Sequence, residues 1–400
     1  MKMTSMTAIG LCSTLLWAVL GSAAIAADGA APGSKISFKK VQIDTAFRAE
    51  GVAVADFNGD GKLDIAAGNV YYAAPDWKMH PIREKPASFP PRGYSDCFAC
   101  FADDLNGDGR PDLIVVDMPG KSTCWYENPG KPGGPWKKHL MVTVTNNESP
   151  LYEDVDGDGH RELVFGYSPD PKQPDGPERR MAIAKPGKDP YQPWEIHTIS
   201  AAGGAGSKKY SHGMGVGDLN GDGRNDVLVS EGWYEQPADK HQTPWSFHPA
   251  NFGPDCAQMM VFDFAGNGHN SVLTSSAHRY GVWWHEPSAD GWKSQTIDQS
   301  ISQTHAVCLA DLNGDGLPDI VSGKRWWAHI HGDPGIDEPA LLVWYQLSRS
   351  GGRPAWTRHV IDSDSGVGTQ FQVVDVNGDG LLDIVVSNKK GVFYFQQVRE

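Results

Sequence analysis

The chain has 400 residues, with 49 acidic and 35 basic side chains and a formal net charge of −14. An acidic chain without basic clusters offers no electrostatic surface for nucleic acid or for an anionic membrane. The 46 glycines, 28 prolines and 14 tryptophans, together with the lack of sustained helical periodicity, indicate an almost all-β protein that is rich in loops.

The first 26 residues have the pattern of a secretory signal. Lys2 is followed by an apolar run from Ala8 to Leu20 and by small residues up to Ala26. The run is too short to span a bilayer, and no later stretch is apolar enough. We therefore expect a secreted or periplasmic protein with a short linker over 27–34 and a single domain over 35–400. One cysteine lies in the signal, so an odd number remains and at least one thiol is expected to be free.

A nine-residue motif occurs seven times and organises the rest of the chain. The copies begin at Asp56, Asp104, Asp154, Asp218, Asp263, Asp311 and Asp375. All but the fifth have the pattern D-x-(N/D)-G-D-G-x-x-(D/E), and the intervals between them are 48, 50, 64, 45, 48 and 64 residues. Such a long period is typical of a repeat architecture.

Each intact motif offers oxygen ligands for a calcium ion. Calcium takes six to eight oxygens, and positions 1, 3, 5 and 9 of the loop supply side-chain oxygens while glycine at position 6 permits the turn. Apolar runs flank the loops and indicate strands rather than the helices of an EF-hand. The alternative is a polar hairpin turn without an ion. The expected ligands of about six structural Ca²⁺ sites are Asp56, Asn58, Asp60, Asp64, Asp104, Asn106, Asp108, Asp112, Asp154, Asp156, Asp158, Glu162, Asp218, Asn220, Asp222, Asp226, Asp311, Asn313, Asp315, Asp319, Asp375, Asn377, Asp379 and Asp383.

The fifth copy, which starts at Asp263, keeps the turn glycines but has Asn267 and Ser271 at positions 5 and 9. Because two carboxylates are missing, we expect this loop to hold no ion.

The segments after each loop predict the rest of a repeat. An aromatic strand and then a strand that opens on tryptophan follow the two strands around the loop, as in Trp125–Pro129 and Trp136–His139. Four antiparallel strands in each of seven repeats predict a seven-bladed β-propeller. The last repeat lacks a fourth strand, and Phe38–Ile43 matches that strand. We therefore expect the N-terminal strand to pair with the C-terminal blade and to close the ring.

Five histidines lie three residues after the tryptophan of a fourth strand. We interpret them as structural residues of the outer strands and assign them no chemistry: His80, His139, His197, His248 and His359.

The repeated motif resembles that of the FG-GAP/VCBS-type seven-bladed propellers, which include integrin α-subunit heads, fungal lectins and secreted bacterial enzymes. The resemblance covers residues 35–400 and implies the fold. A narrower resemblance, carried by Thr304-His305 and by Gly323–His329, is to the propeller domain of aldos-2-ulose dehydratase and its bacterial relatives. It implies an activity on oxidised sugars, although the cupin domains of the fungal enzyme are absent, which puts any isomerase step in doubt.

The blades of a propeller surround a central channel. The period of the repeats predicts which residues meet at one mouth of this channel. The residue six positions before each loop is equivalent in every blade and lies near this mouth: Glu50, Phe98, Glu148, His212, Ala257, His305 and Thr369. The second strand returns to the same face at Asn69, Asp117, Tyr167, Glu231, Ser276, Lys324 and Asn388. We therefore expect His212 and His305 to approach each other, although they lie 93 residues apart.

Two insertions, over 168–180 and 324–339, open on the same face and could wall a pocket. Different functional side chains that converge on one axis favour a site, although a lone histidine or glutamate on a rim is more often solvated or paired. The candidate catalytic residues are His212, His305, Lys324, Arg325, Tyr210, His329 and His278. Trp326 and Trp327 could stack on a sugar ring or could belong to the core of the insertion.

Histidine and carboxylate side chains at this mouth could also hold one Zn²⁺ or Mn²⁺. The candidate ligands are His212, His305, Glu50, Glu148 and Glu231. Such an ion polarises a carbonyl and acidifies the neighbouring C–H. In that scheme a histidine or Tyr210 removes the proton, and Lys324 or Arg325 offsets the charge of the enolate.

The leading hypothesis is therefore a secreted, calcium-stabilised and monomeric lyase or dehydratase that acts on a keto-sugar or a related saccharide. The alternative is a non-catalytic propeller that binds glycan or protein, in the manner of a lectin or an adhesion domain. Such a lectin would more often show several similar pockets between its blades.

Overall fold

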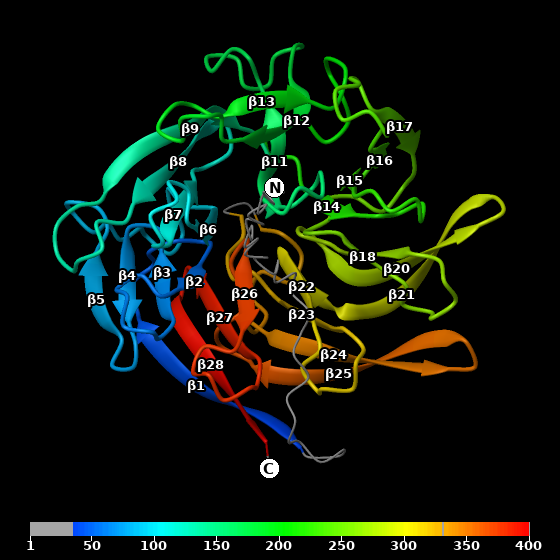
Figure 1. The fold of residues 1–400 in the computed structure, drawn as a ribbon. Coiled ribbons are helices and arrows are strands. Elements are labelled where there is room, and N and C mark those ends of the chain that lie inside the picture. Colours follow the sequence, from blue (N-terminus) through cyan, green and yellow to red (C-terminus); the bar gives the residue numbers. More distant parts are fainter. Residues whose placement is uncertain (1–34, 330–331, 400) are drawn as a thin grey trace, which may run out of the picture.

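The computed structural model describes residues 35–329 and 332–399. The predicted signal and nearly all of the linker therefore lie outside the described residues. The described part contains 28 strands in seven four-stranded antiparallel sheets. Figure 1 shows these sheets arranged as blades around a central channel. The predicted all-β propeller of seven blades is confirmed.

The blades follow one another along the chain, and each uses four strands from the channel outwards. Blade one is β2 (Ala53–Ala55), β3 (Asp64–Ala67), β4 (Val70–Ala73) and β5 (Lys78–Pro81). Blade two is β6 (Ala99–Asp103), β7 (Asp112–Val116), β8 (Lys121–Glu127) and β9 (Lys137–Thr145). Blade three is β10 (Leu151–Glu153), β11 (Glu162–Tyr167), β12 (Arg180–Lys185) and β13 (Glu195–Thr198). Blade four is β14 (Met214–Gly217), β15 (Asp226–Val229), β16 (Gly232–Glu235) and β17 (Ser246–Pro249).

The last three blades complete the ring. Blade five is β18 (Met260–Phe262), β19 (Ser271–Ser275), β20 (Tyr280–Ser288) and β21 (Gly291–Ser302). Blade six is β22 (Ala306–Ala310), β23 (Asp319–Gly323), β24 (Leu342–Ser350) and β25 (Arg353–Asp362). Blade seven is β26 (Phe371–Val374), β27 (Asp383–Asn388), β28 (Gly391–Arg399) and β1 (Ile36–Asp44).

Ring closure follows the prediction. Strand β1 pairs with β28, and Phe38 and Lys40 lie opposite Gln397 and Phe395. The first and last strands of the described chain thus share one sheet, which closes the ring.

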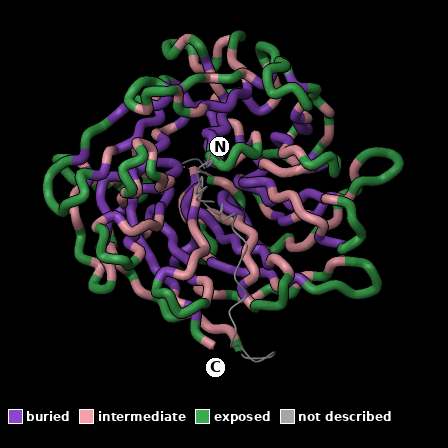
Figure 2. Tube along the Cα trace, viewed as in Figure 1, coloured by how far each residue is buried: buried purple, intermediate pink, exposed green. Residues whose placement is uncertain are grey.

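The apolar core lies between neighbouring blades. Every residue of the inner strands β7, β19 and β27 is buried, because both faces of these strands are covered by adjacent sheets. The outer strand β25 mixes exposed and partly buried residues because one of its faces meets solvent. Figure 2 shows this gradient from the buried interior to the exposed periphery.

The outer-strand histidines occupy structural positions, as predicted. His139 and His248 stack on Trp125 and Trp233 with ring centroids 4.3 and 4.2 Å apart. Their Nε2 atoms lie 2.8 and 2.7 Å from the carboxylates of Glu127 and Glu235. His80 and His359 make the same kind of stack on Tyr71 and Trp344, and His197 lies 4.0 Å from Glu195.

All five cysteines of the described chain are free thiols, and four of them are buried. The expectation of at least one free thiol is confirmed.

The seven loops join the first and second strands of their blades and share one backbone conformation. In each, the two glycines of the motif have φ between 70° and 88°, as Gly59 and Gly61 illustrate at 74° and 83°. The first aspartate caps the turn, and both carboxylate oxygens of Asp56 accept backbone N–H groups of the loop. The fifth loop makes the same contacts from Asp263, so its fold does not depend on the two missing carboxylates.

Candidate metal centre at the channel mouth

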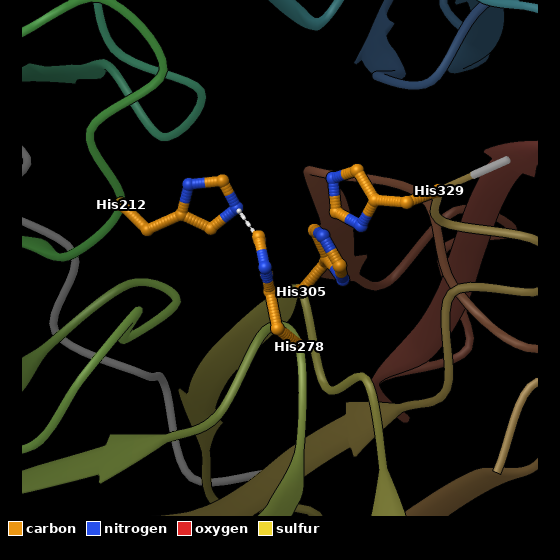
Figure 3. Close-up of side chains that lie close together, drawn as sticks. All are labelled: His212, His278, His305 and His329. Carbon is orange, nitrogen blue, oxygen red and sulfur yellow. Dashed lines mark hydrogen bonds between the residues drawn. The ribbon is translucent and has the colours of Figure 1, made fainter. Parts of the chain in front are cut away.

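Four histidines from three blades converge at the end of the channel away from the motif loops. His212 lies two residues before β14 and His305 lies directly before β22, while His278 lies in the turn between β19 and β20. His329 lies in the insertion between β23 and β24. Figure 3 shows the four rings gathered in one space. We call them the histidine cluster.

The rings of the histidine cluster are close enough to share an ion. The Nε2 atoms of His212 and His278 lie 2.9 Å apart, and each ring offers one nitrogen within 4.8 Å of those of the others. The ring centroids of His212 and His305 lie 5.4 Å apart. The prediction that these two side chains approach each other is confirmed.

Hydrogen bonds at Nδ1 orient three of the rings. The Nδ1 atoms of His212 and His305 lie 3.0 and 3.2 Å from the carbonyl oxygens of Tyr210 and Gln303. The Nδ1 atom of His329 lies 2.7 Å from a carboxylate oxygen of Asp333. An oxygen acceptor fixes the proton on Nδ1, so the lone pair lies on Nε2. Oxygen partners of this kind are typical behind metal-binding histidines.

Left-handed backbone conformations mark the same region. Five non-glycine residues of the described chain have φ in the left-handed region, and four of them lie two residues before a position that faces the channel mouth. They are Tyr210, Asp255, Gln303 and Trp327, with φ of 64°, 52°, 55° and 52°. Each such conformation costs about 1–3 kcal/mol and persists where the surrounding structure requires it, most often at functional sites.

Burial favours the neutral form of three of the four histidines. It lowers the pKa of His212 to about 3, with a further contribution from His278. Burial and the charge of Arg325 hold the pKa of His305 well below its usual value, and burial lowers that of His329. The Nε2 atom of His305 is buried and has no hydrogen-bond partner. Neutral imidazoles with converging lone pairs are the form that binds a transition metal.

A buried ionic network forms the floor of the site, and we call it the ionic floor. Arg325 Nη2 lies 2.5 Å from Glu50 and its Nη1 lies 3.4 Å from Glu148. Lys389 Nζ lies 3.9 Å from Glu50. Blades one, three, six and seven thus each contribute one charged side chain, and all four side chains are at most 6% exposed.

The ionic floor meets the histidine cluster at Glu148, whose Oε2 lies 3.7 Å from His212 Nε2. Burial raises the pKa of Glu50, although Arg325 and Lys389 oppose the shift. Burial and the charge of Arg325 lower the pKa of Lys389 to about 8.

Several predicted site residues have other roles in the structure. Lys324 donates hydrogen bonds to the carbonyl oxygens of Gly335 and Glu338, so it braces the insertion and does not face the cluster. Glu231 is exposed and is not among the ion-binding groups of the described residues. Glu50 is paired with Arg325. His212 and His305 thus lie together with His278 and His329 and not with Glu50 and Glu231, while Glu148 lies 3.7 Å from His212.

The aromatic candidates also differ in what they can contact. Arg92 lies over the ring of Trp327 at 4.1 Å and Lys390 lies over that of Trp326 at 5.1 Å, so each ring has one face covered by a cation. Tyr210 is 47% exposed, and its backbone bonds to the cluster through His212. Tyr210 is thus the aromatic side chain beside the cluster that is open to solvent.

Lys389 and Asp333 are site residues that the sequence reasoning missed. Lys389 follows Asn388, which the repeat period placed at the mouth, and the turn between β27 and β28 brings the lysine inwards instead. Asp333 lies four residues after His329, a spacing that could have suggested their contact.

Burial raises the pKa of the carboxylate at position 9 of each intact motif loop. In the third loop, ligand atoms of Asp154, Asp156, Asp158 and Glu162 lie within 4.8 Å of one another. The residue at position 9 is buried, and its oxygens accept backbone N–H groups, as Asp64 does from Phe57 and Ala74. Burial, with the neighbouring loop aspartates, raises the pKa of Asp112 to about 7. Position 9 therefore holds the loop to its blade whether or not an ion is bound.

The fold and this site define a seven-bladed β-propeller with one asymmetric cluster of functional groups at the channel mouth. The family model described as an FG-GAP-like repeat matches residues 104–165 and 263–322, and the FG-GAP repeat model matches residues 49–74. These segments of the β-propeller are therefore similar to FG-GAP repeats. Within the described residues, there is no helix long and apolar enough to cross a bilayer.

Solved structures share the architecture at low identity. A lectin of Agrocybe aegerita that recognises non-reducing terminal N-acetylglucosamine is 15% identical, with a TM-score of 0.45 over 91% of this chain and 86% of the lectin. BBS1N, solved in complex with ARL6DN from a mercury-soaked crystal, is 12% identical, with a TM-score of 0.50 over 89% of this chain and 94% of that chain. These likenesses concern the fold alone. No curated protein matches the chain, so the narrower resemblance to aldos-2-ulose dehydratase gains no support.

Proposed function

We propose that the protein is a secreted carbohydrate-active lyase or dehydratase whose site is a transition-metal centre at the channel mouth. The observation that carries the proposal is the histidine cluster. Four imidazoles from three blades point their nitrogens at one another, and the buried Nε2 of His305 has no partner. A buried nitrogen lone pair without a donor costs free energy, which a shared cation recovers.

The donor set fits Zn²⁺ or Mn²⁺. Imidazole nitrogens suit zinc and related first-row ions, whereas the hard ions calcium and magnesium prefer oxygen. The oxygens of Tyr210, Gln303 and Asp333 behind the rings supply the orientation that such sites need. A bound ion would polarise the carbonyl group of a keto-sugar and so acidify the C–H next to it.

The residues around the cluster can serve an elimination. In such a reaction a proton leaves the carbon beside the carbonyl, the hydroxyl group on the next carbon leaves with a proton as water, and a conjugated carbon–carbon double bond forms. Glu148 offers a carboxylate oxygen 3.7 Å from His212 Nε2, and the exposed Tyr210 offers a phenol. The carboxylate of Glu148 can take the proton, and Tyr210 can take it as the phenolate. Arg325 lies beneath them as a fixed positive charge that offsets an enolate.

The charge of the site suits a substrate that becomes anionic. The two glutamates, the arginine and the lysine of the ionic floor balance one another when all are charged, and burial favours the neutral form of His212, His305 and His329. A divalent ion would therefore leave the mouth positive. This balance favours an enolate over the neutral sugar from which it forms.

The experiment combines metal analysis with a substrate screen. The purified protein, loaded with Zn²⁺ or Mn²⁺, is analysed for metals other than calcium by mass spectrometry. It is then incubated with keto-hexoses and keto-glycosides while the ultraviolet absorbance of a new enone is followed. One bound transition metal and turnover that disappears in His305→Ala would support the proposal. A protein with no such metal and no turnover would contradict it.

The binding alternative predicts a series of similar pockets between the blades. One pocket of about 630 Å³ lies at the seam of blades seven and one and is lined by Trp77 and Tyr394. Another of about 370 Å³ lies between blades three and four and is lined by Trp245 and Lys240. Both pockets lie beside a motif loop of one blade and the tryptophan that opens the fourth strand of the next blade, so they favour the binding alternative. We prefer the enzyme because the histidine cluster is not repeated from blade to blade. Glycan binding that survives loss of the histidine cluster would reverse this preference.

We further propose that the intact motif loops bind Ca²⁺. Support comes from the shared turn conformation, from the four closely spaced carboxylates of the third loop, and from the raised pKa of buried loop carboxylates such as Asp319, to about 7. A carboxylate that burial and like charges make hard to ionise is stabilised by a bound cation. Secretion, proposed from the signal pattern of residues 1–26, would supply the calcium-rich surroundings that such loops need.

A further inference from the structure

We propose that Lys389 is a positioning residue that holds His329 in the histidine cluster through a hydrogen bond to the carbonyl oxygen of Trp327. The proposal deepens the proposed metal centre and rests on it for its consequence, but the contact itself is independent of any ion. Lys389 Nζ lies 2.7 Å from this carbonyl oxygen and comes from blade seven, whereas His329 belongs to blade six.

His329 needs such a partner because of where it lies. His212, His278 and His305 lie within three residues of a blade strand, so the sheets fix their backbone. His329 lies in the insertion between β23 and β24, six residues after the last residue of β23. A ligand on a long insertion loses more conformational entropy on ordering than a ligand at the end of a strand.

The comparison with His212 and His305 shows what Lys389 replaces. In these two cases, the left-handed residue two positions earlier turns its carbonyl oxygen to the Nδ1 atom of the histidine itself. Trp327 is the equivalent left-handed residue before His329, yet its carbonyl oxygen accepts from Lys389. The Nδ1 atom of His329 contacts Asp333 instead. The ammonium group thus occupies the place that the imidazole takes in the other two turns.

The surroundings of Lys389 argue against a chance contact. Its side chain is 1% exposed, lies 3.9 Å from Glu50 and lies over the ring of Tyr94 at 4.5 Å. Burying an ammonium group is costly unless it is paired and hydrogen-bonded. Glu50 is already paired with Arg325 at 2.5 Å, so the closest hydrogen-bond partner of Lys389 is the carbonyl oxygen of Trp327.

The test compares Lys389→Met with Lys390→Met in the full-length protein. Lys390 is the next residue, and its ammonium pairs with Asp364 and lies over the ring of Trp326, so its replacement removes the same charge but leaves the carbonyl oxygen of Trp327 with its partner. Affinity for Zn²⁺ is measured by competition with a chromophoric chelator, and the coordination of Co²⁺ by its visible absorption. Lys389→Met is expected to weaken Zn²⁺ binding by about 10–100-fold, the range typical of residues that orient a metal ligand. Lys390→Met is expected to bind like the unaltered protein.

A double variant separates positioning from general electrostatics. If Lys389 acts through His329, then His329→Ala and His329→Ala/Lys389→Met bind Zn²⁺ equally, because the positioned ligand is already gone. If Lys389→Met weakens binding to the same extent with and without His329, Lys389 acts through the charge of the site and the proposal is overturned.

Hydrogen–deuterium exchange tests the contact without any metal. Peptides that cover 325–329 are expected to exchange faster in Lys389→Met than in Lys390→Met. Equal exchange in the two variants overturns the positioning role. An unaltered protein that binds neither Zn²⁺ nor Co²⁺ refutes the metal centre, and the exchange comparison then decides the contact separately.

Discussion

The outer strands and the channel mouth both bury histidines against other rings, but their ring nitrogens meet different partners. His139 stacks on Trp125 and contacts Glu127, and His248, two blades later, makes the same two contacts with Trp233 and Glu235. The mouth histidines face one another, with two Nε2 atoms 2.9 Å apart. His139 and His248 have carboxylate partners within the chain. The ring nitrogens of the mouth histidines face one another and require a proton or a cation between their lone pairs.

The outer histidines and the mouth histidines also differ in whether their position repeats from blade to blade. The outer histidines recur at one position of the fourth strand, so their role belongs to the blade. The mouth histidines come from one equivalent position before the first strands of blades four and six, from a turn after a second strand and from an insertion. In a repeat protein, a feature shared by the blades serves the architecture, and a departure confined to one end of the axis marks the function.

Removal of calcium is expected to have the largest effect on stability. It acts on the motif loops, which repeat from blade to blade. Ions that bind only the folded state stabilise it by about 2.7 kcal/mol each at a hundred times their dissociation constant. With about six sites, dialysis against EGTA should lower the melting temperature by more than about 10 °C, and added Ca²⁺ should restore it. A melting temperature that EGTA leaves unchanged would show that the loops are turns without ions.

Replacement of the mouth histidines is expected to act on function and to leave the architecture intact. His212→Ala or His305→Ala should lower transition-metal affinity by more than about 100-fold, beyond the range of residues that only orient a ligand. Neither side chain packs in a blade core, so calcium-dependent melting should stay within a few degrees of that of the unaltered protein. Metal content and calorimetry are measured on the same samples. Unchanged metal content would remove the basis of the proposed site.

The matched change in an outer strand should give the opposite result. His139→Ala removes the stack on Trp125 and leaves Glu127 without its imidazole partner. The expected loss is about 1–2 kcal/mol of unfolding free energy, with transition-metal binding unchanged. Denaturant titration tests the loss of unfolding free energy, and metal analysis tests whether transition-metal binding is unchanged. A loss of metal without a loss of stability would break the distinction between the two groups of histidines.

The fold could be predicted because its determinants repeat. Each loop carries two glycines with left-handed φ between two strands, and seven such hairpins at blade spacing leave few other topologies. The same period placed His212 and His305 at one mouth. It could not show that His278 and His329 close on them, because a turn and an insertion follow no period. The pairing of Arg325 with Glu50 and Glu148 depends on three blades meeting at the axis, which no local pattern reveals.

A fall in pH should change the stability of the protein in opposite directions with and without bound calcium. Burial, with neighbouring carboxylates, raises the pKa of Asp112, Glu162 and Asp319 to about 7. A raised folded-state pKa contributes stability that is lost as the pH rises through about 7, so the calcium-free protein should gain stability as the pH falls from 8 to 6.5. After allowance for partial exposure, the gain is on the order of 1 kcal/mol. In excess Ca²⁺, protons compete with the ion and the trend should reverse. Melting curves in EGTA and in Ca²⁺ with the same slope against pH would contradict this.

The smallest expected effect distinguishes the fifth loop from its intact neighbours. Asp263 and Asp311 make the same backbone hydrogen bonds in their turns, as Gly268 and Gly316 both donate to them at 2.8 Å. Asp263→Ala and Asp311→Ala should therefore each lose about 1 kcal/mol from the turn. Only Asp311→Ala should also lose a calcium ion, because the fifth loop has Asn267 and Ser271 where the sixth has Asp315 and Asp319. Calcium counted by atomic absorption should fall by one for Asp311→Ala and stay constant for Asp263→Ala. An equal loss in both would mean that the two missing carboxylates do not prevent binding and that the turn itself supplies enough oxygen ligands.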